Sequence, residues 1–128
     1  MPLTDPMLLQ LLKEKTEKHN KAIEQEKVKK LENMSSEDRK NRPIARGVLD
    51  YFPDALAEVA YVSKVGNDQH NPGQPMHWAK EKSTDHADCI LRHLIDRGKF
   101  DKDGMRHSAK VAWRALALLQ IEIENERN

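Results

Sequence analysis

The chain has 128 residues, enough for one domain of ordinary size, and 22 Lys and Arg against 21 Asp and Glu give a formal net charge of +1. This near-balance disfavours a dedicated nucleic-acid binder, which carries a strong basic excess. A single cysteine excludes a disulfide within the chain and suits a reducing compartment. We therefore expect no stable nucleic-acid binding.

No stretch approaches the ~20 apolar residues that a membrane helix needs. The opening residues also lack the basic region and the small-residue cleavage site of a secretory signal. We expect a soluble protein of the cytoplasm, which is the host cytoplasm if a phage encodes it.

Residues 1–43 are predicted to form a charged helical arm and linker, with 10 Lys and Arg, 8 Asp and Glu, and no aromatic residue. Thr4-Asp5-Pro6 is typical of a helix start, because a capping oxygen precedes a proline whose missing N–H costs nothing there. We expect this helix to run to about Glu32, and a short second helix to start near Ser35. The arm is expected to dock on a partner subunit or to stay partly mobile.

Residues 44–128 carry the pattern of a compact helical domain. A first core helix is expected over residues 53–64, followed by a Gly-, Asn- and Pro-rich loop over 66–75. A second helix is expected to begin at residue 76 or 83 and to end at 97, before a glycine. A third helix is expected over 105–126, and because it is apolar on more than half of its circumference it should be central.

The second helix is expected to bury one apolar face, made of Ala87, Ile90, Leu91, Leu94 and Ile95. Strand-like alternation of polar and apolar residues is absent from the sequence. The predicted fold is therefore all-α, a small helical bundle with an N-terminal charged arm.

Four carboxylates are spaced so that each pair shares a helix face. Asp54 and Glu58 are four residues apart in the first core helix, and Asp85 and Asp88 are three apart in the second. Helical bundles assemble oxygen-rich Mg²⁺ or Mn²⁺ sites from such pairs. Acids on the side of a helix opposite its apolar stripe are, alternatively, often only solvated by water. A metal site requires that the two acidic faces meet, within the chain or across a dimer.

Histidines and amides gather in the second half of the sequence. Arg92 precedes His93. A guanidinium that can form two parallel hydrogen bonds to a phosphate therefore lies next to an imidazole that can gain or lose a proton near neutral pH. The histidines lack the spacing of a structural zinc site. The loop that ends at Trp78 can bind a nucleobase by hydrogen bonds and stacking, or it can be a polar surface loop whose tryptophan packs on the core. Its polar residues are Asn67, His70, Asn71 and His77.

An ordered set of residues spans about two thirds of the chain, and it consists of the run Tyr51 to Ala60, Gly66, His77-Trp78, Leu91 to Leu94, Asp103-Gly104 and His107 before a long apolar helix. This set resembles a phage-rich family of dATP/dGTP diphosphohydrolase domains, some of them of the MazZ type. The family is related to the MazG-like nucleotide pyrophosphohydrolases, which are all-α, metal-dependent and oligomeric.

The resemblance implies hydrolysis of a purine deoxynucleoside triphosphate to the monophosphate and pyrophosphate, with Mg²⁺ or Mn²⁺ as cofactor and a homo-oligomer, a dimer or tetramer, as the assembly. It places the metal ligands at Glu58, Asp85, Asp88 and Asp54, and catalytic roles at Glu58 and His93. Substrate contacts are implied for Lys64, Asn67, His70, Asn71, His77, Trp78, Arg92, His107 and Lys110. The chain departs from the family where the first acidic pair is spaced by four rather than three, and where an asparagine near Trp113 is missing.

The sequence is also compatible with two functions other than nucleotide hydrolysis. A non-enzymatic phage accessory protein would use the charged arm to bind a host or replication partner. A DNA binder would use the lysines of the arm, but ten basic against eight acidic residues give it little excess charge. Stabilisation by a nucleotide with Mn²⁺ separates the enzyme from both alternatives.

Overall fold

The computed structural model describes residues 5–25 and 27–127 of the chain. These residues form helices and, apart from one isolated antiparallel bridge between Phe100 and Arg106, no β-structure. The predicted all-α fold is therefore confirmed. No helix among the described residues is long and apolar enough to cross a membrane.

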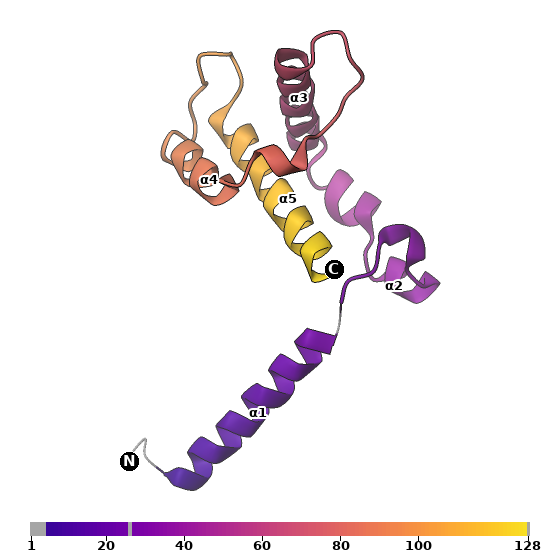
Figure 1. Ribbon diagram of the computed structural model, residues 1–128, viewed down its shortest axis with the longest axis vertical. Coiled ribbons are helices and arrows are strands. Elements are labelled where there is room, and N and C mark those ends of the chain that lie inside the picture. Colours follow the sequence, from indigo (N-terminus) through magenta and orange to yellow (C-terminus); the bar gives the residue numbers. More distant parts are fainter. Residues whose placement is uncertain (1–4, 26, 128) are drawn as a thin grey trace.

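Helix α1 (Pro6–Gln25) starts where the sequence predicts, because the Asp5 carboxylate accepts a hydrogen bond from the backbone N–H of Met7 at 3.0 Å. Thr4, the other predicted capping residue, lies outside the described residues. The helix is shorter than predicted. It ends at Gln25, and Val28 is no longer helical. The Val28 carbonyl accepts a hydrogen bond from Arg127 Nε at 2.7 Å, which connects the segment after α1 to the end of the last helix. Figure 1 shows α1 extending away from the rest of the molecule.

Two short helical turns follow α1, the 3₁₀ turn η1 (Leu31–Asn33) and helix α2 (Ser36–Lys40). Ser35 caps α2, as predicted, since its Oγ accepts a hydrogen bond from the Asp38 N–H at 3.1 Å. A π-helical turn, η2 (Ala45–Leu49), then leads into the body of the molecule.

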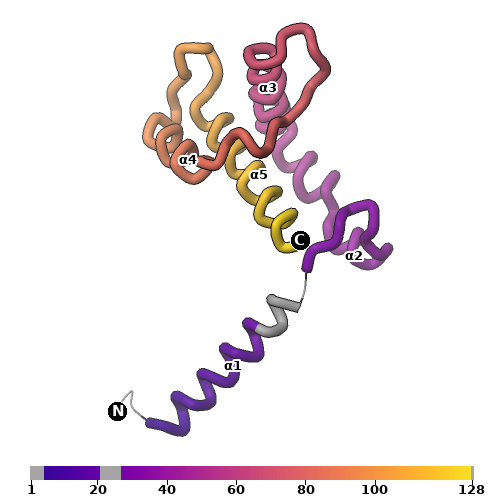
Figure 2. Tube along the Cα trace, in the orientation of Figure 1, coloured from indigo at the N-terminus to yellow at the C-terminus, as the bar shows by residue number. Residues whose placement is uncertain are grey.

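The body consists of α3 (Pro53–His70), the 3₁₀ turn η3 (Lys80–Lys82), α4 (His86–Ile95) and α5 (His107–Glu126). Helices α3 and α4 each pack against α5, which lies between them in Figures 1 and 2. The turn before α5 reverses the chain at Gly104, whose φ of 81° favours glycine. The central position predicted for the last helix is confirmed.

The prediction was wrong at the boundary between the first core helix and the loop. Helix α3 continues through the glycine at position 66 to His70, supported by an ion pair between Lys64 and Asp68 at 3.0 Å. The second core helix begins at His86, later than either predicted start. Asn67 stabilises the irregular conformation of the intervening loop, because its buried side chain forms hydrogen bonds with backbone groups of the loop.

Asn67 uses both halves of its amide in this loop. Its Nδ2 donates to the Gln74 carbonyl at 3.1 Å, and its Oδ1 accepts from the His77 N–H at 3.0 Å. A side chain that replaces backbone partners in this way fixes an irregular segment without secondary structure. Trp78 follows directly and is thereby brought against α5.

The buried face of α4 also differs from the prediction. Leu91, Leu94 and Ile95 are 59%, 41% and 76% exposed. Ala87 is exposed as well, Ile90 is half-buried, and the residues that face α5 are His86 and Cys89. The apolar stripe therefore points outward, because α4 meets α5 through polar contacts that a hydrophobicity pattern does not register.

The apolar core of a single chain is small. Among the described residues its buried members are Cys89, Met105, Ala109 and Ala117. The accessible surface is 10763 Å², whereas a compact monomer of 14.8 kDa exposes about 7,000 Å². One chain thus leaves a large apolar area uncovered.

We predict that Asn67→Ala lowers the free energy of unfolding by about 1–3 kcal/mol, because it leaves the Gln74 carbonyl and the His77 N–H without their partner. Urea unfolding followed by circular dichroism measures this change. Gln69→Ala, at an exposed position two residues along the same helix, is the matched control. Equal stability of the two variants would contradict the role of Asn67.

Candidate functional site

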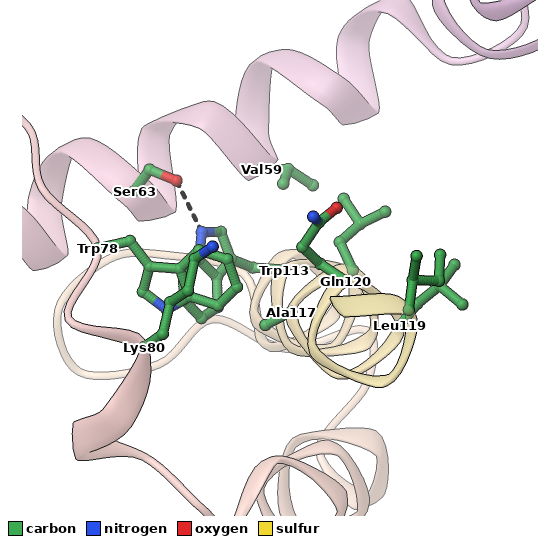
Figure 3. Close-up of a pocket in the computed structure, with 10 residues that line it drawn as sticks. Val59, Ser63, Trp78, Lys80, Trp113, Ala117, Leu119 and Gln120 are labelled. Atoms are coloured by element: carbon green, nitrogen blue, oxygen red, sulfur yellow. Dashed lines mark hydrogen bonds between the residues drawn. The ribbon is translucent and has the colours of Figure 1, made fainter. Parts of the chain in front are cut away.

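An open groove of about 470 Å³ runs between α3, the segment at Trp78 and one face of α5. Trp78 and Trp113 meet edge to face inside it, with ring centroids 5.7 Å apart. The Trp113 indole donates a hydrogen bond to Ser63 Oγ at 2.7 Å, the dashed line in Figure 3. The groove is lined by Val59, Ser63, Trp78, Lys80, Trp113, Leu116, Ala117, Leu119, Gln120 and Ile123.

Lys80 forms the charged edge of this groove. Its ammonium lies 5.1 Å from the centre of the Trp78 ring and bonds to the carboxylate of Glu124, with 2.9 Å to Oε2. The hydrogen bond from Lys80 lowers the pKa of Glu124. The groove thus combines aromatic faces with one cation, which suits a flat, electron-rich ring that carries a negative charge elsewhere.

A second group of polar side chains lies between α4 and the start of α5. His93 Nδ1 and His107 Nδ1 are 2.9 Å apart, and candidate ligand atoms of His93, His107 and Asp101 all lie within 4.8 Å of one another. All three side chains are half-buried. Burial lowers the pKa of His93, and the charges of Lys110 and His107 lower it further. We call these three residues the histidine cluster.

Lys110 joins the histidine cluster to the turn before α5. Its ammonium donates to Asp101 at 2.6 Å and to Asp103 at 2.7 Å, and its side chain is 16% exposed. Burial acts to lower the pKa of Lys110, but the hydrogen bonds to the two carboxylates outweigh it and the pKa is raised. The hydrogen bond from Lys110 to Asp101 lowers the pKa of Asp101 to about 2.

His86, the first residue of α4, makes another buried polar contact with α5. The Arg114 guanidinium lies 3.1 Å from His86 Nδ1, so that nitrogen accepts and the proton sits on Nε2, which has no partner among the described residues. Burial, followed by the charge of Arg114, lowers the pKa of His86. The side of α4 that faces α5 is therefore polar over most of its length.

The four predicted acidic ligands are not brought together within one chain. Asp54 and Glu58 lie exposed on α3, and Asp88 lies exposed on α4. Asp85 precedes α4 and lies 3.6 Å from Arg92, and the hydrogen bond from Cys89 lowers its pKa. In the part of the chain that the structure describes, the histidine cluster is the group whose candidate ligand atoms converge. The acids could meet only across an assembly, so their role as metal ligands stays a prediction.

The predicted substrate residues separate into three places. Trp78 lines the groove. His107 belongs to the histidine cluster, with His93, which was predicted to be catalytic, and Lys110 bonds to its Asp101, whereas Arg92 donates to Cys89 Sγ near the start of α4. The remaining ones lie on the loop and the end of α3, where Lys64 pairs with Asp68 and Asn67 is taken up by the backbone; His70 and His77 are exposed there and Asn71 is half-buried.

Sequence analysis missed several residues of both places. Lys80, Trp113 and Gln120 line the groove, and none of them was among the predicted site residues. Asp101 was not among them either, although it lies eight residues after His93 and six before His107. That proximity of an acid to two histidines was the signal that could have found it.

The structure is therefore that of an all-α protein with an aromatic groove beside α5 and a polar, partly buried histidine cluster between α4 and α5. The sequence model of the dATP/dGTP diphosphohydrolase, N-terminal, family matches residues 32–128. The chain belongs to this family. The match begins within the segment assigned to the arm and takes in the last two residues of η1 and all of α2. Comparison with curated proteins found no match, and neither did comparison with solved structures.

We predict that Lys80→Met raises the pKa of Glu124 toward its ordinary value of 4.5, because the bond from the ammonium stabilises the ionised carboxylate. Since the folded-state pKa is the lower one, the ion pair stabilises the fold fully above pH 4.5 and loses this effect as the pH falls. Carboxyl NMR titration measures the shift. Lys82→Met, on the same turn, should leave the Glu124 titration unchanged.

Proposed function

We propose that the chain hydrolyses purine deoxynucleoside triphosphates, chiefly dATP or dGTP, to the monophosphate and pyrophosphate. In this reaction a water oxygen bonds to the α-phosphorus, the bond from that phosphorus to the α–β bridging oxygen breaks, and pyrophosphate leaves with that oxygen. The observation that carries the proposal is the open groove lined by Trp78 and Trp113, in a chain whose family description names dATP and dGTP.

The groove offers what a purine ring needs. Its volume of about 470 Å³ lies in the range of small-molecule sites. Stacking of a base on an aromatic side chain contributes about 1–3 kcal/mol. The Gln120 amide and the Lys80 ammonium stand on the wall of the groove as donors for ring nitrogens or a carbonyl. These features support the groove as the base pocket.

Cationic side chains near α4 support the phosphate end of the proposal. Arg92 is 62% exposed; its Nη2 donates to Cys89 Sγ and lies 3.6 Å from Asp85, and the guanidinium has further N–H groups to offer a phosphate. Lys64 is exposed but paired with Asp68. Lys110 is enclosed by two carboxylates, so of these three cations Arg92 is the one we assign first to the leaving pyrophosphate.

Dependence on Mg²⁺ or Mn²⁺ belongs to the proposal, but the acids do not fit an ion within one chain. Glu58 and Asp54 stand on α3, while Asp85 and Asp88 stand at α4, and their oxygens do not converge among the described residues. We therefore derive no step through that ion. The acids retain this role only if a second copy brings their faces together.

We further propose that the active form is a homo-oligomer, a dimer or tetramer. The surface of one chain exceeds that of a compact monomer of its mass by about half. Obligate interfaces bury areas of this order and are apolar. Leu91, Leu94 and Ile95 form an exposed apolar stripe on α4 that is part of this surface, and a second copy, which carries the same stripe, is the occupant that can cover it.

We expect the purified chain, incubated with each dNTP and with GTP in the presence of Mg²⁺ or Mn²⁺, to convert a purine dNTP to dNMP and pyrophosphate. Ion-exchange chromatography resolves these products and ranks the bases. Release of single phosphates would indicate a phosphatase. Folded protein that turns over none of them would overturn the proposal and favour a non-enzymatic accessory protein.

We predict that Trp78→Ala raises KM for the preferred purine dNTP by about tenfold or more, as loss of base stacking requires, with a smaller effect on kcat. Steady-state kinetics separate the two constants. Tyr51→Ala removes an aromatic ring that is 72% exposed and does not line the groove. If both variants change KM equally, the groove is not the base pocket.

We predict that light scattering after size exclusion gives wild-type particles of at least twice 14.8 kDa. Ile95→Glu should weaken their association at least about tenfold, because it places a charge in a desolvated apolar contact. Lys99→Glu changes charge nearby at an exposed position and should leave the mass unchanged. A wild-type monomer would refute the oligomer.

A further inference from the structure

The rings of His93 and His107 meet nitrogen to nitrogen between two helices. Their Nδ1 atoms are 2.9 Å apart and their ring centres 5.1 Å apart. One histidine lies in the last turn of α4 and the other begins α5. At this distance either the Nδ1–H of one ring donates to the bare Nδ1 of the other, or a metal cation takes the place of that proton and binds both nitrogens.

The spacing of these nitrogens fits a metal ion. Metal–imidazole bonds are about 2.0–2.1 Å long, so two nitrogens on one ion lie about 2.9 Å apart at the right angle of octahedral coordination and about 3.3 Å apart at a tetrahedral angle. The observed separation of 2.9 Å matches the octahedral value. Asp101, in the turn that joins the two helices, brings a carboxylate oxygen within 4.8 Å of a ring nitrogen of each histidine. Two imidazoles and one carboxylate are a common ligand set for divalent transition metals.

We propose that His93, His107 and Asp101 bind one divalent transition-metal ion of the class that includes Co²⁺ and Zn²⁺. The nitrogen donors favour this class over Mg²⁺, which prefers oxygen. Three protein ligands leave coordination positions open to water or to a ligand oxygen. The site is separate from the acids on α3 and α4 that the family resemblance assigns to Mg²⁺ or Mn²⁺.

The groups around the site tolerate a cation. Asp101 accepts hydrogen bonds at both oxygens, from Lys110 Nζ and from the backbone N–H of Lys102, and each oxygen keeps a second lone pair for the metal. Asp101 and Asp103 carry two negative charges, and Lys110 together with Arg114, whose charge also lowers the pKa of His93, carries two positive ones, so these charges balance before the ion binds. Lys110 keeps Asp103 as a partner when the metal takes a share of Asp101.

The metal site does not depend on the proposed function. If the chain does hydrolyse nucleotides, the open positions of the ion and the Lys110 ammonium offer contacts for phosphate oxygens. If it does not, the three ligands still predict metal binding. A test by direct binding therefore distinguishes failure of this inference from failure of the hydrolase proposal.

Titration of the full chain with Co²⁺, followed by its visible absorption, tests the site. We expect one equivalent to bind, with affinity at least about tenfold weaker in His93→Ala and in His107→Ala, since each variant loses one of three protein ligands. His19→Ala, on the exposed face of α1, should bind as the wild type does. Equal binding by all four proteins, or no cobalt spectrum from the wild type, overturns the site.

A second measurement uses the wild-type protein alone, so that it does not depend on how the variants fold. Long-range ¹H–¹⁵N spectra of the histidine rings, recorded with and without Zn²⁺, should show the Nδ1 signals of His93 and His107 move together at one equivalent. The signals of His19, His70 and His77 should stay in place. Movement of those exposed rings in place of the pair would assign the metal to nonspecific sites and overturn the proposal.

Discussion

Helix α5 carries both chemical regions of this molecule on neighbouring faces, because side chains three and four residues apart share a face of a helix. His107, Lys110 and Arg114 repeat at this spacing and meet α4 and the turn before α5 through hydrogen bonds. Trp113, Ala117 and Gln120 repeat in the same way and form the floor of the groove beside α3. One helix therefore sets the distance between an aromatic region and a polar one, and any ligand that uses both must reach around it.

The packing of α4 explains why one chain has so little apolar core. A helix with a strong apolar stripe ordinarily buries that stripe, and burial of a leucine or isoleucine side chain contributes about 1.5–3 kcal/mol. Here Leu91 and Ile95 face outward while His86 and Cys89 face α5. This arrangement is unfavourable for an isolated chain, and the proposed association, in which a second copy covers the stripe, would remove that cost. Leu116 and Leu119 of the groove are about half exposed too.

The sequence was sufficient for the helices and insufficient for their faces. The all-α class, the cap at Ser35 and the central last helix follow from local patterns, and the structure has them. The course of the loop after α3 did not follow, because the buried amide of Asn67 fixes it through contacts seven and ten residues away. The start of α4 at His86 did not follow either, and no side-chain cap marks it. The face that α4 buries did not follow either, since periodicity predicts that the apolar side is covered and does not say by which chain. Trp78 was found by residue type, whereas Lys80 and Gln120 carry no local signal and join the groove only through the fold.

The polar seam between α4 and α5 is more costly than a structural role requires. Histidine pairs and enclosed lysine–carboxylate contacts give little net stability compared with apolar residues of similar size, because each charged or polar group loses its hydration on burial. The seam holds His93 against His107, His86 against Arg114 and Lys110 between two carboxylates. A bundle selected for stability alone would fill these positions with the leucines and isoleucines that α4 instead turns outward. Departures of this kind from the local rules concentrate where binding or catalysis takes place, so the seam, rather than the exposed acids of α3, is where the chemistry of the chain is best sought.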